Sequence, residues 1–540
     1  MSDKMTKPRS PEQEILLSAL IGPLRYTIPI ISYAVLYPLI LKRFGLEVLG
    51  LWSLLATIIT YLSLADAGFS ALFTREMTQN NGPDLARKHG AEYQTAHLFY
   101  LLLTTLLFMG VLFSFPLWQG RCIYLPGITN PAFFLLDLTC LILTGTTVLA
   151  SKIENSILVA QTQIVYTQLV TISTPVLLLI LNIAGALLGH PIEGFAVGAL
   201  CSSIVEYNLY HRQVLRILPG FRDALPPIGN PVAFRHHLGH LIRRGKYLYL
   251  SQLGGNLRDP LFRFILAGSF GLPSVAVFDV AFRLTRTVMD MATGGIVKSL
   301  FPVLARFHQN HQTDKTTDLM HSSFLALLVI STCGQGGVIM FGEPFYQLWL
   351  GSVPPHLMSA TLALTGWLFL ATLFIPFISL LNAYRHEGIL AIGTWLHIVL
   401  SILLLPLAKF GNLSVPIVIG LWAVIGCLPI LIGVTAVVIR EPKTVSWLKR
   451  PAILGLTLAG FGILLLMTLG QQLKLSIPVR MLVWSASIFL YLIMTGRAMF
   501  MYELVPIIPW PSPTEFRNRL RVRKKTPPIS PDDAPPLYHE

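Results

Sequence analysis

The chain has 540 residues, of which 53% are hydrophobic and only 12% are charged. Soluble domains carry about 25% charged residues, so this composition excludes an ordinary water-soluble protein. A formal net charge of +14 would suggest nucleic-acid binding in a soluble protein. In a membrane protein it indicates Lys- and Arg-rich cytoplasmic loops instead, and no nucleic-acid partner is expected.

Apolar runs long enough to cross a bilayer recur along the chain, and we predict fourteen membrane-spanning helices. The first is a retained span without a signal-peptide cleavage site. In chain order the approximate spans are 15–41, 47–74, 96–116, 132–153, 161–188, 192–211, 246–269, 274–304, 321–342, 357–383, 388–409, 413–439, 451–471 and 478–500. With both chain ends in the cytoplasm, inside segments hold 28 of the 40 Lys and Arg residues and outside loops hold six. This bias matches the positive-inside rule.

An internal repeat is indicated by two pairs of segments. Phe44–Leu46 corresponds to Phe270–Leu272 at an offset of 226 residues, and Val159–Gln161 corresponds to Asn382–Tyr384 at an offset of 223. Apolar helices also align by composition alone, but the shared glycines favour a true repeat. An even number of spans in each half makes this a parallel repeat, as in some transporters.

The repeat predicts the domain organisation. Six-helix lobes at 1–211 and 246–440 are joined by a basic linker at 212–245, and two further helices lie at 451–500. We therefore predict an all-α polytopic membrane protein whose two lobes face each other across a central cavity. The Pro-rich basic tail at 501–540 is expected to be disordered and to contact anionic membrane lipids.

The linker contains a possible metal motif. His236, His237 and His240 show a helical HHxxH spacing. Zinc sites use other ligand orders such as HExxH, so a basic amphipathic helix on the membrane surface is favoured over 234–246. The five cysteines include no CxxC pair, and no metal or disulfide is predicted.

The eighth predicted span, 274–304, which we call helix 8, carries four charged residues on one face. They are Asp279, Arg283, Arg286 and Asp290. Each costs about 2.5–3.5 kcal/mol near the centre of a membrane helix, so the face must line a cavity or contact protein. The alternative is that Asp279–Arg283 and Arg286–Asp290 pair within the helix and only stabilise packing.

The seventh predicted span, 246–269, which we call helix 7, carries Arg258, Asp259 and Arg263 beside Pro260. Proline weakens the helical hydrogen-bond ladder, and broken helices beside charges recur at transporter binding sites. The alternative is a structural kink with a local Asp259–Arg263 pair.

The other charges within or next to the spans are more ambiguous. Arg25 is either a cavity residue or an interfacial anchor, and Asp66 is either a gate or a packing contact. Lys298 is close enough to the cytoplasmic end to snorkel.

Cations outnumber acids in helices 1, 2, 7 and 8, and arginine grips phosphate oxygens with parallel hydrogen bonds. A phosphate or acidic-sugar cargo is therefore expected. The candidate cargo-binding residues are Arg25, Arg258, Arg263, Arg283 and Arg286, and the candidate coupling or gating residues are Asp66, Asp259, Asp279 and Asp290. Outside loops are short and no phosphate-binding loop occurs, so no catalytic residues and no cofactor are predicted, with possible coupling to protons or sodium.

These residues also carry a family resemblance. The stretches Lys42–Gly45, Gly50–Trp52, Asp66–Gly68 with Arg75, and Leu381–Ala383 resemble the polysaccharide transporter family, the O-antigen (Wzx-like) flippases of the multidrug/oligosaccharidyl-lipid/polysaccharide (MOP) exporter superfamily. The resemblance covers roughly residues 15–440. The chain departs from the family at Glu47-Val48, where many members have a Pro-containing turn, and in its long tail.

The resemblance implies a V-shaped, MATE-like bundle in the bacterial inner membrane. It implies transport of an undecaprenyl-pyrophosphate-linked oligosaccharide by alternating access, for surface polysaccharide biosynthesis. The chain would act as a monomer, with polysaccharide polymerase components as further partners. Alternatives are a lipid II flippase or a multidrug or metabolite exporter of the same superfamily. A membrane glycosyltransferase or polymerase fits less well, because it needs catalytic carboxylates or a large outer loop.

Overall fold

The computed structural model describes residues 24–63, 66, 69–79, 85–122, 131–161, 163–218, 231–384 and 386–501. Within these ranges the chain is helical and contains no strand, as the sequence predicted. The helices are α2 (Leu24–Ser63), α3 (Phe69–Gln79), α4 (Leu85–Cys122), α5 (Pro131–Ala160), α6 (Ile164–Leu187), α7 (Pro191–Ile217), α9 (Pro231–Phe270), α10 (Leu272–Gln309), α11 (Thr313–Leu350), α12 (Leu357–Ala383), α13 (Glu387–Phe410), α14 (Val415–Ile425), α15 (Leu428–Arg440), η2 (Ser446–Lys449), α16 (Pro451–Gln472) and α17 (Ile477–Met501).

Ten segments among the described residues are long and apolar enough to cross a membrane. The chain is therefore a multi-pass membrane protein. The two helices with the charged residues of the sequence analysis, α9 and α10, are not among these ten segments. The predicted count of fourteen spans is consistent with the order of the helices once α2 is divided at its kink, α3 is counted with the second part of α2, and α14 is joined to α15.

The internal repeat reappears in the backbone. Gly45 within α2 and Gly271 before α10 have φ values of 85° and 82°, and they are separated by the 226-residue offset of the first sequence match. Gly189 and Asn412 have φ values of 93° and 49°, and they are separated by the second offset, 223 residues. Glycine is favoured at such positions because it has no Cβ.

Helix lengths follow the same correspondence. α4 and α11 each have 38 residues, and α6 and α13 each have 24. These matching lengths and φ values are consistent with the predicted repeat. The exact lobe boundaries predicted from the sequence remain a prediction.

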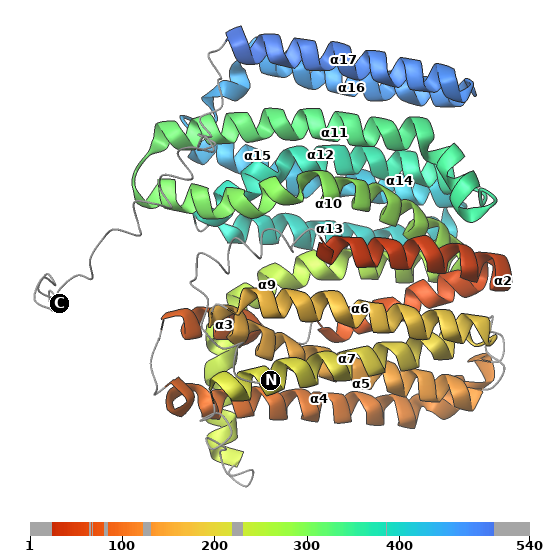
Figure 1. Cartoon of the computed structure of the whole chain (residues 1–540), viewed down its shortest axis with the longest axis vertical. Helices are drawn as coiled ribbons and strands as arrows, with labels where there is room; N and C mark the ends of the chain where they lie inside the picture. Colours follow the sequence, from red (N-terminus) through yellow and green to blue (C-terminus); the bar gives the residue numbers. More distant parts are fainter. Residues whose placement is uncertain are drawn as a thin grey trace, which may run out of the picture.

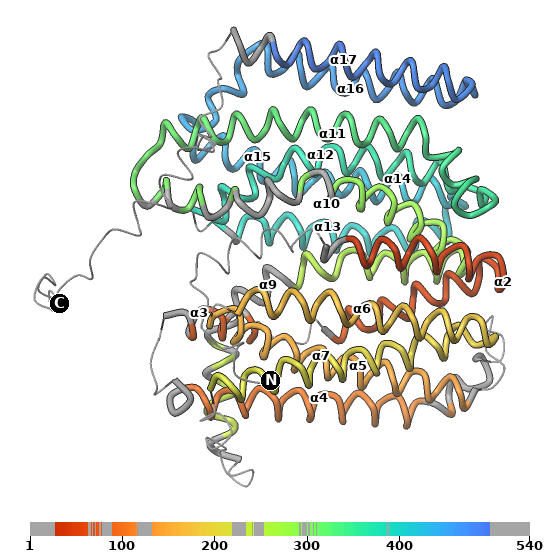
Figure 2. The backbone as a smooth tube through the Cα atoms, viewed as in Figure 1, coloured from red at the N-terminus to blue at the C-terminus, as the bar shows by residue number. Residues whose placement is uncertain are grey.

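Figure 1 shows how the halves are arranged, and Figure 2 traces the same path through the Cα atoms. Helices α3 to α7 gather on one side and α10 to α15 on the other, while α16 and α17 pack against α11 at the outer edge. Helix α2 contacts α5 and α6 of the first half and α9 and α10 of the second. One buried apolar core, which includes Tyr37, Trp52, Phe278 and Trp422, joins the two halves.

Local sequence explains where the observed helices depart from the predicted spans. The predicted span 413–439 is divided into α14 and α15, and Pro429 lies in the first turn of α15, where its missing N–H costs no hydrogen bond. The predicted span 47–74 is divided between α2 and α3. The predicted surface helix at 234–246 instead continues into the next span as one helix, α9, and no proline interrupts it there.

The two halves approach each other closely at Gly50 in α2. A Cβ atom on this residue would lie 2.0 Å from the carbonyl oxygen of Leu272 at the start of α10. Only glycine allows the two backbones to meet at this distance.

We predict that Gly50→Ala separates α2 from α10 and lowers the free energy of unfolding by about 1–3 kcal/mol through overpacking. Thermal unfolding of the purified protein measures this loss. Gly110→Ala in α4 is the matched control, because a Cβ there meets no atom within 4 Å. Equal stability of the two variants would contradict the close approach.

Candidate functional site

A buried carboxylate, that of Asp279 on α10, joins side chains from both halves. Asp279 is 1% exposed. The guanidinium of Arg263 on α9 donates to Oδ1 from Nη2 at 2.6 Å and from Nε at 3.2 Å. Oδ2 accepts hydrogen bonds from the hydroxyl of Tyr37 and, at 3.2 Å, from that of Ser53, both on α2. We call these four residues the Asp279 cluster.

This cluster lies on the repeat. Ser53 and Asp279 are 226 residues apart, which is the offset between Gly45 and Gly271. Equivalent positions of the two halves therefore touch each other where α2 meets α10. The cluster is close to the end of the bundle that contains Gly45 and Gly271, which we call the Gly45 end.

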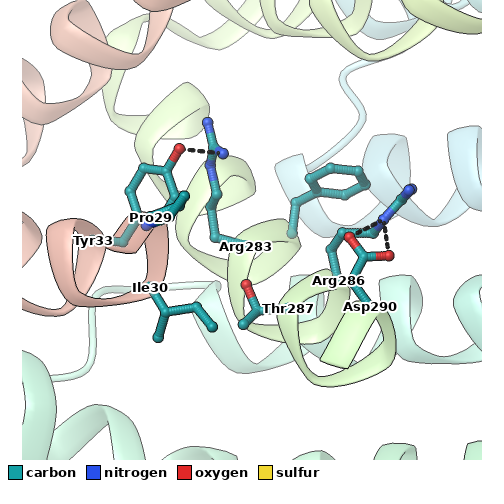
Figure 3. Close-up of a pocket in the computed structure, with 8 residues that line it drawn as sticks. Pro29, Ile30, Tyr33, Arg283, Arg286, Thr287 and Asp290 are labelled. Atoms are coloured by element: carbon teal, nitrogen blue, oxygen red, sulfur yellow. Dashed lines mark hydrogen bonds and ion pairs between the residues drawn. The ribbon is translucent and has the colours of Figure 1, made fainter. Parts of the chain in front are cut away.

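A pocket opens one turn further along α10. It is lined by Pro29, Ile30, Tyr33, Phe282, Arg283, Arg286, Thr287 and Asp290, with about 560 Å³ of empty space (Figure 3). We call it the Arg283 pocket. Its residues come from α2 and α10, so it lies between the two halves.

The two arginines of the pocket are held differently. Arg283 donates from Nη1 to the Tyr33 hydroxyl at 2.6 Å, and its guanidinium carbon lies 4.2 Å from the centre of the Tyr33 ring. Its Nε lies 3.5 Å from Oδ2 of Asp279 but makes no hydrogen bond with the described residues. Arg286 donates from Nε to both carboxylate oxygens of Asp290 at 3.0 Å, and both side chains are more than 40% exposed.

The remaining charged residues of the predicted span 246–269, now part of α9, lie elsewhere. Arg258 pairs with its neighbour Asp259 at 2.7 Å, and its guanidinium carbon lies 4.8 Å from the ring centre of Trp367 and 5.9 Å from that of Trp422. The pair therefore packs inside the second half and does not line the Arg283 pocket. The local Asp259–Arg263 pair considered from the sequence is not formed, because Arg263 binds Asp279.

Asp66 is 6% exposed and forms packing contacts in the first half. Its carboxylate accepts hydrogen bonds from the Ser70 backbone N–H at 3.2 Å and from the Tyr100 hydroxyl at 2.6 Å. It thus caps the start of α3 and ties it to α4. The side chains of Arg25 and Lys298 lie outside the described part of the structure.

The other sequence motifs add no site. No group of three or more His, Cys, Asp or Glu residues that could hold a metal occurs among the described residues. His236 and His237 pack edge to face, whereas the side chain of His240 is outside the described set. The basic tail after Met501 is likewise outside it.

Sequence reasoning found the charged face of α10 but missed its partners. Tyr33, Tyr37 and Ser53 on α2 carry no charge, so no cost of membrane insertion marks them. The one available signal was the repeat, because it makes Ser53 the equivalent of Asp279.

The buried and exposed ion pairs of α10 should differ strongly in their effect on stability. Asp279→Asn leaves the buried Arg263 without its counter-charge, and we expect a loss of about 3–5 kcal/mol. Asp290→Asn removes the partner of the exposed Arg286, and we expect a loss below about 1 kcal/mol. Thermal unfolding in detergent compares the two, and equal losses would mean that Asp279 is not sealed from water.

Comparison with known proteins finds likenesses of fold alone. No family model and no curated protein sequence matches the chain. Solved structures do: one titled lipid II flippase MurJ in an inward closed conformation has a TM-score of 0.62, at 14% identity over 91% of this chain and 100% of its own. An inward-facing multidrug resistance MATE family transporter of the MOP superfamily has a TM-score of 0.60, at 14% identity over 81% of this chain and 99% of its own. The MATE multidrug transporter DinF-BH has a TM-score of 0.57, at 15% identity over 82% of this chain and 99% of its own. The chain therefore shares the fold of these solved transporter and flippase structures.

Proposed function

We propose that the chain is a flippase that moves a lipid-linked, pyrophosphate-bearing oligosaccharide across the bacterial cytoplasmic membrane. The observation that carries this proposal is the Arg283 pocket, which places two partly exposed guanidinium groups between the halves of a transporter fold.

The charge balance of the site favours an anion. Asp279 is shared by Arg263 and Arg283, so these three residues keep one positive charge in excess. The Arg286–Asp290 pair adds no net charge. Arg283 donates to a neutral hydroxyl, that of Tyr33, and a phosphate oxygen is a stronger hydrogen-bond acceptor.

The Asp279 cluster supports alternating access. Together with the close contact at Gly50, it joins α2 to α10 at the Gly45 end, while the Arg283 pocket is open. The positive-inside bias puts the Gly45 end on the periplasmic side. The pocket then receives cargo from the cytoplasmic side, and breaking the Asp279 cluster opens the opposite side.

We predict that Arg283→Gln lowers the transport rate at least about 10-fold, since a charge-assisted hydrogen bond contributes about 1.5–3 kcal/mol. Arg286→Gln should have a smaller effect, because Asp290 already binds that guanidinium. The assay follows a fluorescent polyprenyl-pyrophosphate oligosaccharide in proteoliposomes with a quencher that cannot cross the membrane.

The matched control is Arg235→Gln, which removes one arginine from an exposed position on α9. It should transport normally. Arg283→Lys separates charge from shape, because lysine keeps the charge but cannot stack on Tyr33 or bind phosphate with a planar fork. Wild-type rates for Arg283→Gln would remove the pocket from the transport route.

A lipid II flippase is the second candidate. The MurJ structure aligns with 91% of this chain, against 81% and 82% for the two MATE structures. Both lipid-linked cargoes present a pyrophosphate, so the arginines do not separate them.

Cargo competition separates the candidates. We expect excess unlabelled lipid-linked oligosaccharide to slow transport of the fluorescent analogue, and lipid II or a cationic dye to leave it unchanged. Competition by lipid II alone would assign the chain to the second candidate. Competition by the cationic dye alone would favour a multidrug exporter.

A further inference from the structure

Another buried carboxylate, that of Glu154 on α5, lies in the first half, away from the Arg283 pocket. Glu154 is fully buried. Its neighbours are Tyr93 and His97 on α4 and His211 on α7, and we call these four residues the Glu154 cluster. The sequence analysis did not identify any of them.

All the polar neighbours converge on one carboxylate oxygen. Oε1 accepts a hydrogen bond from the Tyr93 hydroxyl, and Nδ1 of His211 lies 2.8 Å from it. Nε2 of His97 lies 3.6 Å from the same oxygen. The other oxygen, Oε2, is buried without a hydrogen-bond partner among the described residues. A buried carboxylate with this uneven set of partners is under-satisfied.

The tautomer of His97 follows from its other nitrogen. Nδ1 lies 3.0 Å from the Tyr93 backbone carbonyl, which can only accept, so Nδ1 carries a hydrogen. In neutral His97 the lone pair of Nε2 therefore faces the Glu154 carboxylate. Two acceptors then point at each other, and Nε2 also has no hydrogen-bond partner among the described residues.

One added proton resolves this conflict. A proton taken from water onto Nε2 converts His97 into an imidazolium that donates toward Oε1, and no other bond changes. The buried negative charge of Glu154 is then matched by a positive charge, which lowers the cost of keeping it away from water. Histidine is suited to this role because it titrates near neutral pH.

The surroundings leave few other charges to compensate Glu154. Tyr207 on α7 lies with its ring centre 5.3 Å from that of His211 and 6.4 Å from that of His97. The core packed around the cluster takes apolar side chains from α3 and α9, among them Phe73 and Leu241. On α5 itself the nearest cation is Lys152, which interacts electrostatically with Asp66.

The cluster also reaches the protein surface and the other half. The side chains of His97 and His211 are 20% and 33% exposed whereas Glu154 is buried, so the histidines are the outermost of these groups. Leu241 belongs to α9, the same helix that carries Arg263 of the Asp279 cluster. A change in packing around Glu154 can therefore move the helix on which the Asp279 cluster depends.

We propose that the Glu154 cluster binds the proton that drives the transport cycle, a role that rests on the proposed function. The proton resides on Nε2 of His97, and its arrival changes how α4 packs against α9.

The first test is direct detection of the proton by nitrogen-15 NMR of protein labelled at histidine, in lipid vesicles. The His97 signals are those lost in His97→Gln. We expect the Nε2 signal to change from that of a bare ring nitrogen to that of a protonated one as the pH falls, because the proposed proton site is this atom. Glu154→Gln should shift the midpoint of this titration by about one pH unit or more. The control His236→Gln, at an exposed position, should leave it unchanged.

The second test follows the Gly45 end of the bundle. Spin labels at Leu188→Cys and Leu348→Cys, in a chain whose five native cysteines are replaced, report the separation of the two halves. The two leucines are 77% and 86% exposed. Leu188 directly follows the end of α6, and Leu348 lies two residues before the end of α11. We expect the distance distribution from pulsed electron resonance to change between about pH 5 and pH 9 and to be fixed in His97→Gln.

The outcomes separate this inference from the proposed function, because neither measurement uses a cargo. If Glu154→Gln leaves the titration midpoint of the His97 signal unchanged, the proposed proton site is wrong. A titrating His97 with a constant label separation would overturn its part in the cycle. If Glu154→Gln does not fold, Tyr93→Phe removes one donor to Oε1 and must still shift the His97 titration.

Discussion

The contact between the two halves depends on satisfying one carboxylate that water cannot reach. Asp279 takes its counter-charge from α9 and two hydroxyl hydrogen bonds from α2, so it is stable only while the three helices stay together. Partial separation leaves an unpaired buried ion, which costs several kcal/mol. The Asp279 cluster therefore favours two conformations, one with the cluster intact and one with Asp279 hydrated. Intermediate conformations have a higher free energy, because they leave the buried carboxylate partly unpaired.

The sequence predicted those properties that the bilayer imposes. Span length follows from membrane thickness. The orientation drawn from the distribution of Lys and Arg, and the role drawn for the α10 charges from their cost in lipid, stay predictions. The repeat was visible because Gly45 and Gly271 need a backbone that other residues avoid. These are local or additive effects, and a single sequence contains them.

The partners of the charged residues could not be predicted in the same way. Arg263 reaches Asp279 on the next helix and not Asp259 four residues away, and Arg258 binds its own neighbour while resting on Trp367. Both choices depend on how helices rotate about their axes, which spacing alone does not determine. The Glu154 cluster was missed because His97 and His211 are far apart in sequence and meet only through the packing of α4 and α7 on α5.

The meeting of Ser53 with Asp279 has an evolutionary consequence. If the halves descend from one duplicated unit, these two positions began with the same amino acid and faced each other across the symmetry axis. Two aspartates there would repel, and two serines would leave Arg263 without a counter-ion. Only unlike residues, one a donor and the other an acceptor, satisfy the contact. In such an ancestor, the two equivalent positions had to become different amino acids before the contact between Ser53 and Asp279 could form.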